Sequence, residues 1–368
     1  MTLFTEWNYK QAKTRRAREQ RVDLSILGIT CMRNDGAYAP EWIAHHLAAG
    51  FDRILVLSHD NTDGTDSVLD RLAEDPRIAH VSFAPKGKKS VQWQALKLAD
   101  DHPWVAQADW AMFFDCDEFL CLPDGGTVAD LIAGLETEQG RFDALALPWR
   151  LYGSGGQGAR LDGLTPERFV KAAPQELHFP LAHLFKTLHR PDAFRALGVH
   201  RPRAKKSKPA RWLGPDGVEL SQGFASSDGA ISLYGQSHGK RRAWLNHYSL
   251  RSLDEFLAKR ARGLPNHMER EIGLTYWAER NWNSEDAPEI LPMLEATRAE
   301  LNSLPDTSQE VAACLGAQDQ SCQAAMGDLE TLRLRFRLSL LTGSTPPSAE
   351  DGHTFLKAQI AILQKGQA

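Results

Sequence analysis

Short apolar runs alternate with amphipathic helical patterns through the first third of this 368-residue chain, and this rhythm narrows the folds open to it. The apolar runs span residues 24–32, 53–58, 78–83 and 110–114. The helical patterns span residues 40–50, 65–74 and 90–100. Buried strands that alternate with helices predict an α/β fold, with a mostly parallel, twisted sheet covered by helices on both faces. Ligands of such sheets bind at the carboxyl ends of the strands, so the residues just after each run are the first candidates for chemistry.

The rest of the chain is less regular. Between residues 150 and 240, Gly, Pro and basic residues are frequent, which favours loops and short antiparallel strands. Ser252 and Glu255 form a capping box that predicts the start of a helix. Residues 331–341 fit a helix or a strand, and a Pro-Pro-Ser linker at 346–348 precedes a last short helix. We expect a basic N-terminal arm at 1–21, a main domain at 22–265 and a mainly helical C-terminal appendage at 266–368.

The composition is that of an ordinary globular protein, with 42% hydrophobic and 24% charged residues. A net charge of −4 does not favour nucleic acid as a partner. The five cysteines form no paired framework, so we expect reduced thiols and a cytoplasmic location. No apolar run reaches the roughly 18 residues of a membrane span. We therefore expect no transmembrane segment, and only peripheral contact with any membrane.

Three carboxylates follow the apolar run at 110–114, in the order Asp115, Asp117 and Glu118. Side chains at i and i+2 of an extended segment share a face, so Asp115 and Asp117 are expected to converge while Glu118 points away. Two carboxylates that lie so near each other repel, which costs free energy unless a cation lies between them. Their oxygen atoms suit Mg²⁺ or Mn²⁺. A solvated acidic turn is the alternative interpretation.

Polar residues also follow the first two runs. Arg33, Asn34 and Asp35 come after the first, and an Asp-Asn-Thr-Asp-Gly stretch at 60–64 comes after the second. Both positions are expected to lie at the ligand-binding edge of the sheet. The second stretch is also typical of a turn that caps a helix, so each signal alone is weak.

Several motifs occur in a fixed order along the chain. They are Arg33-Asn34-Asp35, Glu41-Trp42, Asp60-Asn61-Thr62-Asp63, Asp115-Cys116-Asp117-Glu118-Phe119, Trp149-Arg150-Leu151-Tyr152, Glu167-Arg168-Phe169, Asn246-His247-Tyr248, Ser252, Glu255-Phe256, Lys259 and Arg262-Gly263. In this set the chain resembles the bacterial family 2-like glycosyltransferases related to glycosyltransferase family 92, which have the GT-A fold. It departs from them at Asp35, where Glu is commoner, and at Thr62, where Ser is commoner. The resemblance covers about residues 24–265, so the main domain is expected to be a GT-A glycosyltransferase domain.

The resemblance implies an enzyme that moves a sugar from a nucleotide-diphosphate sugar, with UDP expected, onto an unknown glycan, lipid or protein acceptor. It implies that Arg33, Asp35 and Asp60 hold the base and ribose of the donor. It also implies that Asp115 and Asp117 hold a divalent cation, Mn²⁺ or Mg²⁺, which bridges the diphosphate and stabilises the departing nucleotide.

Later motifs extend this site. His247 is expected to complete the metal shell, with His200 as the rival third ligand; either could instead be a buried structural histidine. Lys259 and Arg262 lie at i and i+3 of a helix and are expected to hold the diphosphate, with ion pairs to Glu255 as the alternative.

The sugar and acceptor sides are less defined. Trp149 offers an aromatic face for the sugar of the donor, with core packing as the alternative. An inverting transfer needs a carboxylate base, for which Glu167 is a candidate unless it pairs with Arg168. A retaining transfer needs no such base, so the catalytic base stays unassigned. His45 and His46 are adjacent on a helix and are expected to be structural.

Other functions compete with this interpretation. A phosphatase of the haloacid type also places Asp-x-Asp after an apolar strand, but it has Thr or Val where this chain has Phe119. A glycosidase would need two separated carboxylates and no metal. A non-catalytic carbohydrate-binding protein would have no need of both Asp115 and Asp117. We therefore predict a metal-dependent glycosyltransferase.

Overall fold

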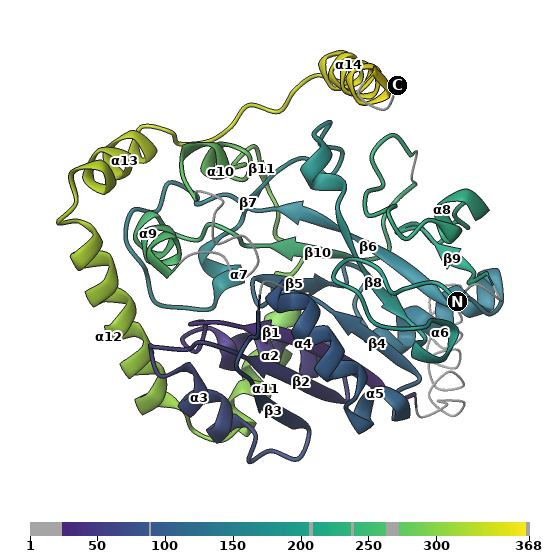
Figure 1. Ribbon diagram of the computed structural model, residues 1–368, viewed down its shortest axis with the longest axis horizontal. Helices are drawn as coiled ribbons and strands as arrows, with labels where there is room; N and C mark the ends of the chain where they lie inside the picture. Colours follow the sequence, from purple (N-terminus) through teal and green to yellow (C-terminus); the bar gives the residue numbers. More distant parts are fainter. Residues whose placement is uncertain (1–23, 88–89, 206–208, 237–238, 263–271, 366–368) are drawn as a thin grey trace, which may run out of the picture.

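The structure, a computed structural model, describes residues 24–87, 90–205, 209–236, 239–262 and 272–365. The predicted basic arm at 1–21 lies outside the described residues. Within them, a nine-stranded sheet with helices on both faces forms the framework of the molecule (Figure 1).

Four parallel strands form one half of this sheet, in the order β3-β2-β1-β4. Their bounds are β1 (Ile26–Met32), β2 (Arg53–Ser58), β3 (Ile78–Ser82) and β4 (Trp110–Phe113). Because the chain returns through a crossover between successive strands, the carboxyl ends of all four meet at the same edge of the sheet.

The other half has mixed strand directions and continues in the order β8-β6-β10-β5. Its strands are β8 (Phe185–His189), β6 (Ala144–Leu151), β10 (Trp244–His247) and β5 (Glu118–Cys121), with β9 (Trp212–Leu213) paired to β6. β8 runs antiparallel to β4 and β6, β10 runs parallel to β6, and β5 runs antiparallel to β10. Three strands separate β4 from β5 in this order, yet only residues 114–117 join them along the chain. The sheet must therefore curl around that connection.

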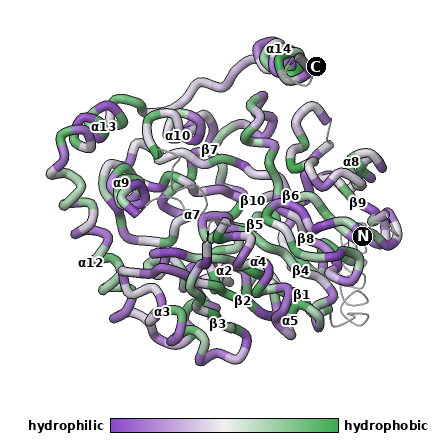
Figure 2. The backbone as a smooth tube through the Cα atoms, viewed as in Figure 1, coloured by the Kyte–Doolittle hydropathy of each residue, from purple (hydrophilic) through white to green (hydrophobic). Residues whose placement is uncertain are grey.

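Hydrophobic side chains of the sheet alternate between two faces. Along β2, Ile54 and Val56 pack into one cluster, while Leu55 and Leu57 pack into another. The first cluster is covered by α2 (Ala39–Ala48), α3 (Thr65–Leu72), α6 (Val128–Gln139) and α11 (Leu294–Ser303), and the second by α4 (Val91–Asp100) and α5 (Pro103–Gln107). Hydrophobic stretches accordingly lie along the central strands (Figure 2). The predicted α/β class, a mostly parallel sheet covered on both faces, is confirmed.

The stretch between β6 and β10 contains only short elements, as its weak periodicity predicts. They are α7 (Thr165–Arg168), β7 (Lys171–Ala172), η1 (Pro180–His183), β8, η2 (Pro191–Ala193), β9 and α8 (Gln222–Ser226). α9 (Leu253–Arg262) then begins at the predicted capping box, where Ser252 N donates to Glu255 Oε2 at 3.1 Å and Glu255 N donates to Ser252 Oγ at 3.4 Å.

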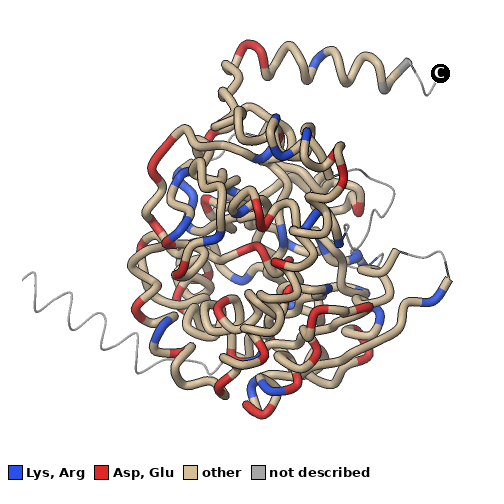
Figure 3. The backbone as a smooth tube through the Cα atoms, turned by 90° about the vertical axis from the view of Figure 1, so that its left-hand side faces the viewer, with Lys and Arg blue, Asp and Glu red and all other residues tan. Residues whose placement is uncertain are grey.

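The C-terminal region packs against the main domain. Its elements are α10 (Leu274–Ala278), β11 (Glu285–Asp286), η3 (Leu291–Met293), α11, α12 (Ser308–Ala325), α13 (Leu329–Ser339) and α14 (Ala349–Lys365). Ile290, Leu304 and Cys314 belong to the same hydrophobic cluster as residues of β1 and α2. α14 projects from the body of the molecule, and acidic and basic residues are interspersed over the side drawn in Figure 3. The described helices include none with the length and apolar character that a membrane crossing requires.

The first four strands and three helices agree with the sequence predictions to within two residues at each end. Residues 331–341, which fit two patterns, lie mostly in α13. α14 has 17 residues, so the prediction of a short last helix was wrong. α6 and α12 were not predicted.

Because the C-terminal region shares the core of the sheet, a cavity made there should destabilise the whole protein. Ile290 is fully buried, so Ile290→Ala should lower the free energy of unfolding by about 2–5 kcal/mol. Leu340 is 65% exposed in the same region, so Leu340→Ala should change it by less than about 0.5 kcal/mol. Urea unfolding followed by both fluorescence and circular dichroism measures this difference. An early, separate transition in the Ile290 variant, with the main transition unchanged, would contradict a shared core.

Candidate active site

A tight turn after β4 carries the three clustered carboxylates. Glu118 N donates to Asp115 O at 3.0 Å, so this segment turns back on itself. The expectation of an extended segment that aligns Asp115 with Asp117 was therefore wrong. The expectation that Glu118 points away was also wrong, because Glu118 Oε2 accepts a hydrogen bond from Asp115 N at 2.9 Å. On α2, the indole Nε1 of Trp42 donates to the carbonyl oxygens of Asp115 and Glu118, at 3.2 and 2.9 Å, and so holds the turn in place.

Asp115 faces a buried lysine. Lys186 on β8 places Nζ 3.0 Å from Asp115 Oδ2 and 3.8 Å from Glu118 Oε1. On α4, Gln92 donates to Asp115 Oδ1 at 3.2 Å. Burial opposes the charge of Lys186, but Asp115 and Glu118 outweigh it and raise the lysine's pKa. Lys186 was not predicted, because it lies in a stretch with no clear pattern.

Asp117 faces β10 and α9 instead. Its Oδ2 lies 2.9 Å from Lys259 Nζ, and its Oδ1 lies 3.4 Å from His247 Nε2. Burial would raise the pKa of Asp117, but Lys259 and His247 hold that pKa well below its usual value. Trp149 packs on His247 with ring centroids 4.3 Å apart, which leaves Trp149 almost wholly buried. Of the predicted metal ligands, Asp117 and His247 thus converge, while Asp115 pairs with Lys186.

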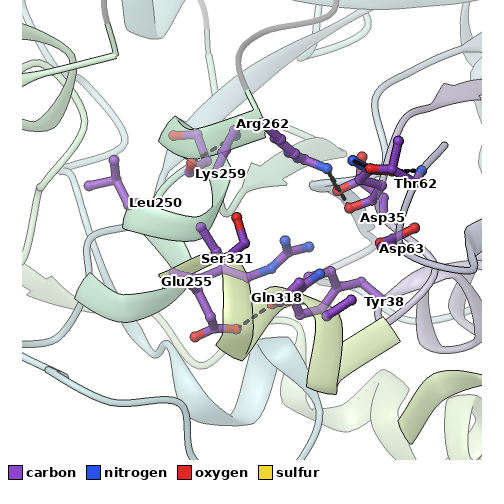
Figure 4. Close-up of a pocket in the computed structure, with 15 residues that line it drawn as sticks. Asp35, Tyr38, Thr62, Asp63, Leu250, Glu255, Lys259, Arg262, Gln318 and Ser321 are labelled. Atoms are coloured by element: carbon purple, nitrogen blue, oxygen red, sulfur yellow. Dashed lines mark hydrogen bonds and ion pairs between the residues drawn. The ribbon is translucent and has the colours of Figure 1, made fainter. Parts of the chain in front are cut away.

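A pocket opens beside this turn, at the carboxyl ends of β1 and β2 (Figure 4). Its lining includes Asn34 and Asp35 after β1, Thr62 and Asp63 after β2, Arg251 just before α9, Lys259 and Arg262 on α9, and Gln318 from α12. Because Lys259 both lines the pocket and contacts Asp117, the pocket and the acidic turn form one continuous site.

Asn34 joins the two strand-end loops that form one wall. Its Nδ2 donates to Thr62 Oγ1 at 3.1 Å, and its Oδ1 accepts from Thr62 N at 2.8 Å. Its backbone N donates to Asn61 Oδ1 at 2.7 Å. Asn34 and Asp60 have φ angles of 53° and 46°, in the left-handed region that Asn and Asp tolerate better than most residues. The Asn and Asp residues of these motifs therefore shape the pocket wall.

The structure brings some of the predicted donor-binding residues together. Asp35 is buried and lies 2.7 Å from Arg262 Nη1, which also donates to the Asn34 carbonyl at 2.7 Å. Asp60 has a 57% exposed side chain and is not part of the pocket lining. Arg33 Nε is buried and has no hydrogen-bond partner among the described residues.

The predicted alternative for the α9 cations was wrong. Lys259 and Arg262 are paired with Asp117 and Asp35, whereas Glu255 is paired with Arg168. This arrangement leaves Glu167 to pair with Arg298 rather than with Arg168, away from the pocket lining.

The other three histidines discussed above, His200, His45 and His46, each have a ring nitrogen within hydrogen-bond distance of a backbone carbonyl oxygen. His200 Nδ1 lies 3.0 Å from Phe185 O, and burial lowers the pKa of His200 to about 4. His45 Nε2 lies 2.8 Å from Leu120 O, and His46 Nδ1 lies 2.8 Å from Trp42 O. Both are fully buried, which confirms their expected structural role.

Two features of the pocket were not predicted. The guanidinium carbon of Arg251 lies 3.6 Å from the centroid of the Tyr38 ring. The Tyr38 hydroxyl lies 3.0 Å from Glu255 Oε1 and 3.1 Å from Gln318 Oε1, so α12 closes one side of the pocket. The sequence of α12 is rich in small and polar residues and gave no pattern that would place it here.

The described residues include no group of three or more His, Cys, Asp or Glu side chains arranged to hold a metal ion. Asp117 and His247 nevertheless supply two converging donors, and His247 Nδ1 has no hydrogen-bond partner in the described part of the chain. Magnesium is usually held by one or two protein ligands together with substrate phosphates. The nitrogen of His247 near Asp117 is Nε2, and Asp117 Oδ2 is already paired with Lys259, so a cation held by this residue pair would have to share Asp117 with that lysine.

Comparison with known proteins finds sequence matches to one glycosyltransferase family. The model of glycosyltransferase family 92 matches residues 38–216. A family 92 protein of Ricinus communis is 23% identical over 199 residues, which cover 47% of this chain and 33% of that protein. A family 92 protein of Oryza sativa subsp. japonica is 26% identical over 174 residues, which cover 46% of this chain and 27% of that protein.

The chain is similar to glycosyltransferase family 92. The expected resemblance to family 92 is thus supported over these residues, while the bacterial and family 2-like character stays a prediction. The chain spans about a third of the length of the curated plant relatives it matches. The family match ends at residue 216, so His247, Arg251, Lys259 and Arg262 lie beyond it.

Structural alignment with solved proteins gives matches of low sequence identity and low TM-score. Residues 1–349 of TarS from S. aureus are 11% identical, with a TM-score of 0.32, and the alignment covers 84% of this chain and 91% of that one. The galactosyltransferase LgtC, in complex with donor and acceptor sugar analogues, is 13% identical with a TM-score of 0.32, and the alignment covers 78% of this chain and 99% of that one.

The hydrogen bonds of Trp42 to the acidic turn can be tested directly. Trp42→Phe keeps an aromatic ring but removes the indole donor from the buried Glu118 carbonyl and from the Asp115 carbonyl, which keeps its bond from Glu118 N, so it should lower stability by about 1–3 kcal/mol. Trp110→Phe is the matched control, since Trp110 is also fully buried but its Nε1 has no partner among the described residues. Thermal unfolding of both variants measures the difference. A loss for Trp110→Phe as large as that for Trp42→Phe would show that ring volume, rather than the hydrogen bonds, is responsible.

Proposed function

We propose that this protein is a glycosyltransferase that uses a nucleotide-diphosphate sugar, with UDP as the expected nucleotide, and is assisted by Mn²⁺ or Mg²⁺. The observation that carries the proposal is the position of the pocket. It lies at the carboxyl ends of β1 and β2, where α/β sheets bind nucleotides, and its lining joins polar strand-end loops to the cations of α9. The similarity to family 92 supports the same activity.

The proposed orientation of the donor follows from the charges. The base and ribose are expected on the side of Asp35 and the β2 loop, where carboxylates and amides can accept and donate hydrogen bonds. The diphosphate is expected near Lys259 on α9 and beside Arg262, which contacts Asp35, because these cations can stabilise negative charge. The sugar would then extend toward the acidic turn and Trp149.

The divalent cation would be held by Asp117 and His247 together with the donor diphosphate. When bound, it would supply electrostatic stabilisation of the leaving nucleotide. Lys259 contacts Asp117 and is placed to share this task. Asp115, which is held by Lys186 and Gln92, is a second carboxylate beside the expected position of the sugar.

The transfer itself breaks the bond between the anomeric carbon and the diphosphate oxygen and forms a bond from that carbon to an acceptor hydroxyl oxygen. The hydroxyl proton passes to a carboxylate base in an inverting transfer, or to the departing diphosphate in a retaining one, and negative charge develops on the departing nucleoside diphosphate. Buried cations aimed at that diphosphate lower the barrier, because electrostatic stabilisation is strong where water is excluded. The acceptor is proposed to be a glycan, lipid or protein hydroxyl.

Removing the charge of Asp117 should abolish metal-dependent transfer. Asp117→Asn loses a charged ligand and the partner of Lys259, so release of free nucleotide from a donor-sugar panel with Mn²⁺ or Mg²⁺ should fall at least about a hundredfold. Asp124→Asn is the control, since Asp124 is exposed and pairs with Lys240. Full wild-type activity in excess EDTA would contradict the metal, and full activity of the Asp117 variant would contradict its role.

Asp60 provides a probe of nucleotide binding that should not disturb the fold. Its side chain is largely exposed and glycine tolerates its φ of 46°, so Asp60→Gly should leave the melting temperature nearly unchanged. If the carboxylate accepts a hydrogen bond from the donor, as the resemblance implies, affinity for free nucleotide should fall by about 1.5–3 kcal/mol. Asp70→Ala, another exposed carboxylate, is the control for general charge effects. Equal affinity of the Asp60 variant and the wild type, measured by calorimetry, would exclude Asp60 from the nucleotide site.

A further inference from the structure

We propose that Arg251 is the residue that recognises the diphosphate of the donor, an inference that rests on the proposed function of this pocket. Arg251 lies in the connection between β10 and α9, and its side chain lines the pocket with those of Lys259 and Arg262. It was not among the residues singled out by the sequence motifs, and it lies beyond the family match. Arg251 differs from the cations around it in the partners of its side chain.

The other three cations around the pocket already have carboxylate partners. Arg262 is paired with Asp35, Lys259 with Asp117, and Arg168 with Glu255. Arg251 makes no ion pair within the part of the chain that the structure describes, and its Nε and Nη2 are buried with no hydrogen-bond partner there. Among the described residues, the pocket therefore holds one buried guanidinium with no carboxylate at ion-pair distance, and the charges of Glu255 and Asp117 act on it only from farther away.

A buried arginine with a purely structural role looks different in this protein. Arg201 is also buried and also stacks on an aromatic ring, that of Trp212. Its Nη1 donates to Phe224 O at 3.0 Å and its Nη2 donates to Ala225 O at 2.9 Å. Leaving a buried charged donor unpaired is costly, so a guanidinium without such partners indicates a ligand that supplies them.

The side chain of Arg251 is held ready for such a ligand. The guanidinium stacks on Tyr38, whose hydroxyl is fixed by Glu255 and Gln318. The backbone of Arg251 has a φ of 57°, a left-handed conformation that is uncommon for a residue with a long side chain. Such conformations cost energy and persist only where the surrounding structure maintains them. They are found most often at active sites and ligand-binding sites.

The geometry selects the chemical class of the ligand. A guanidinium presents a planar fork of donors that matches the oxygens of a phosphate, and stacking leaves the edge of that fork free to bind. Arg251 lines the same pocket as Lys259 and Arg262. A diphosphate that bridges nucleoside and sugar would supply the acceptors that the guanidinium of Arg251 lacks.

The test uses the full chain and calorimetric titration with uridine diphosphate, uridine and inorganic pyrophosphate. In Arg251→Gln, affinity for uridine diphosphate and for pyrophosphate should fall by about tenfold to a hundredfold, while affinity for uridine stays within about twofold. Arg251→Lys keeps the charge but not the fork, so its loss should be smaller. Arg201→Lys is the matched control for a buried, stacked arginine and should bind all three ligands as the wild type does. Circular dichroism and melting temperature establish that each variant is folded.

The outcomes separate the two proposals. One outcome is that the wild type binds uridine diphosphate and that the Arg251→Gln variant binds it equally well. That result would overturn the role of Arg251, while the proposed function would stand. If the glutamine variant does not fold, Arg251→Lys replaces it in this comparison. An equal loss of uridine affinity would also overturn the role of Arg251, because the effect would then be structural. Another outcome is that the wild type binds pyrophosphate through Arg251 but binds none of the diphosphates of uridine, adenosine and guanosine. That result would support the anion site and contradict the proposal that the donor carries a nucleotide. If the wild type binds none of these ligands, both proposals are overturned.

Discussion

The indole of Trp42 holds the turn between β4 and β5, and the arrangement of the site depends on this contact. Its single N–H reaches two carbonyl oxygens, those of Asp115 and Glu118, from the helix that follows β1. The turn joins two strands that are not neighbours, so it also fixes how the sheet curls. With the backbone held in this way, Asp115 and Asp117 are directed to opposite sides, each toward a lysine from a distant part of the chain. One buried hydrogen-bond donor thus connects the fold to the electrostatics of the pocket.

Charge balance is the second constraint. Several ionisable groups are removed from water around the turn and the pocket, and such groups are tolerated where they are paired. Lys186, Lys259 and Arg262 each have a carboxylate within 3.0 Å. Arg251 departs from this pattern, and Asp117 shares its carboxylate between a lysine and a histidine. These two departures lie in one continuous site, which is why the account places the phosphates of a donor and their cation there.

Local sequence patterns predicted the first half of the fold well, because periodicity along β1 to β4 and α2 to α4 reports burial directly. They failed where the structure depends on distant partners. The spacing of Asp115 and Asp117 suggested a shared face, but the segment is a turn that Trp42 holds from α2. Lys186 and Gln318 reach the site from β8 and α12, whose sequences carry little periodicity. Arg251 could not be recognised from sequence, since what distinguishes it is that its guanidinium has no ion-pair partner among the described residues. The resemblance to family 92 drew attention to Asp117 and His247, which the structure brings together.

The central claim is that Asp117, His247 and the cations of α9 form one site for the phosphates of a nucleotide and a divalent ion. The most direct measurement is a crystal structure of the protein with uridine diphosphate and Mn²⁺, with the metal located by anomalous scattering. The account predicts a manganese peak between Asp117 and His247, with the diphosphate oxygens contacting both the metal and the guanidinium of Arg251. Nucleotide bound elsewhere on the molecule, or bound in the pocket with manganese absent from Asp117 and His247, would contradict it.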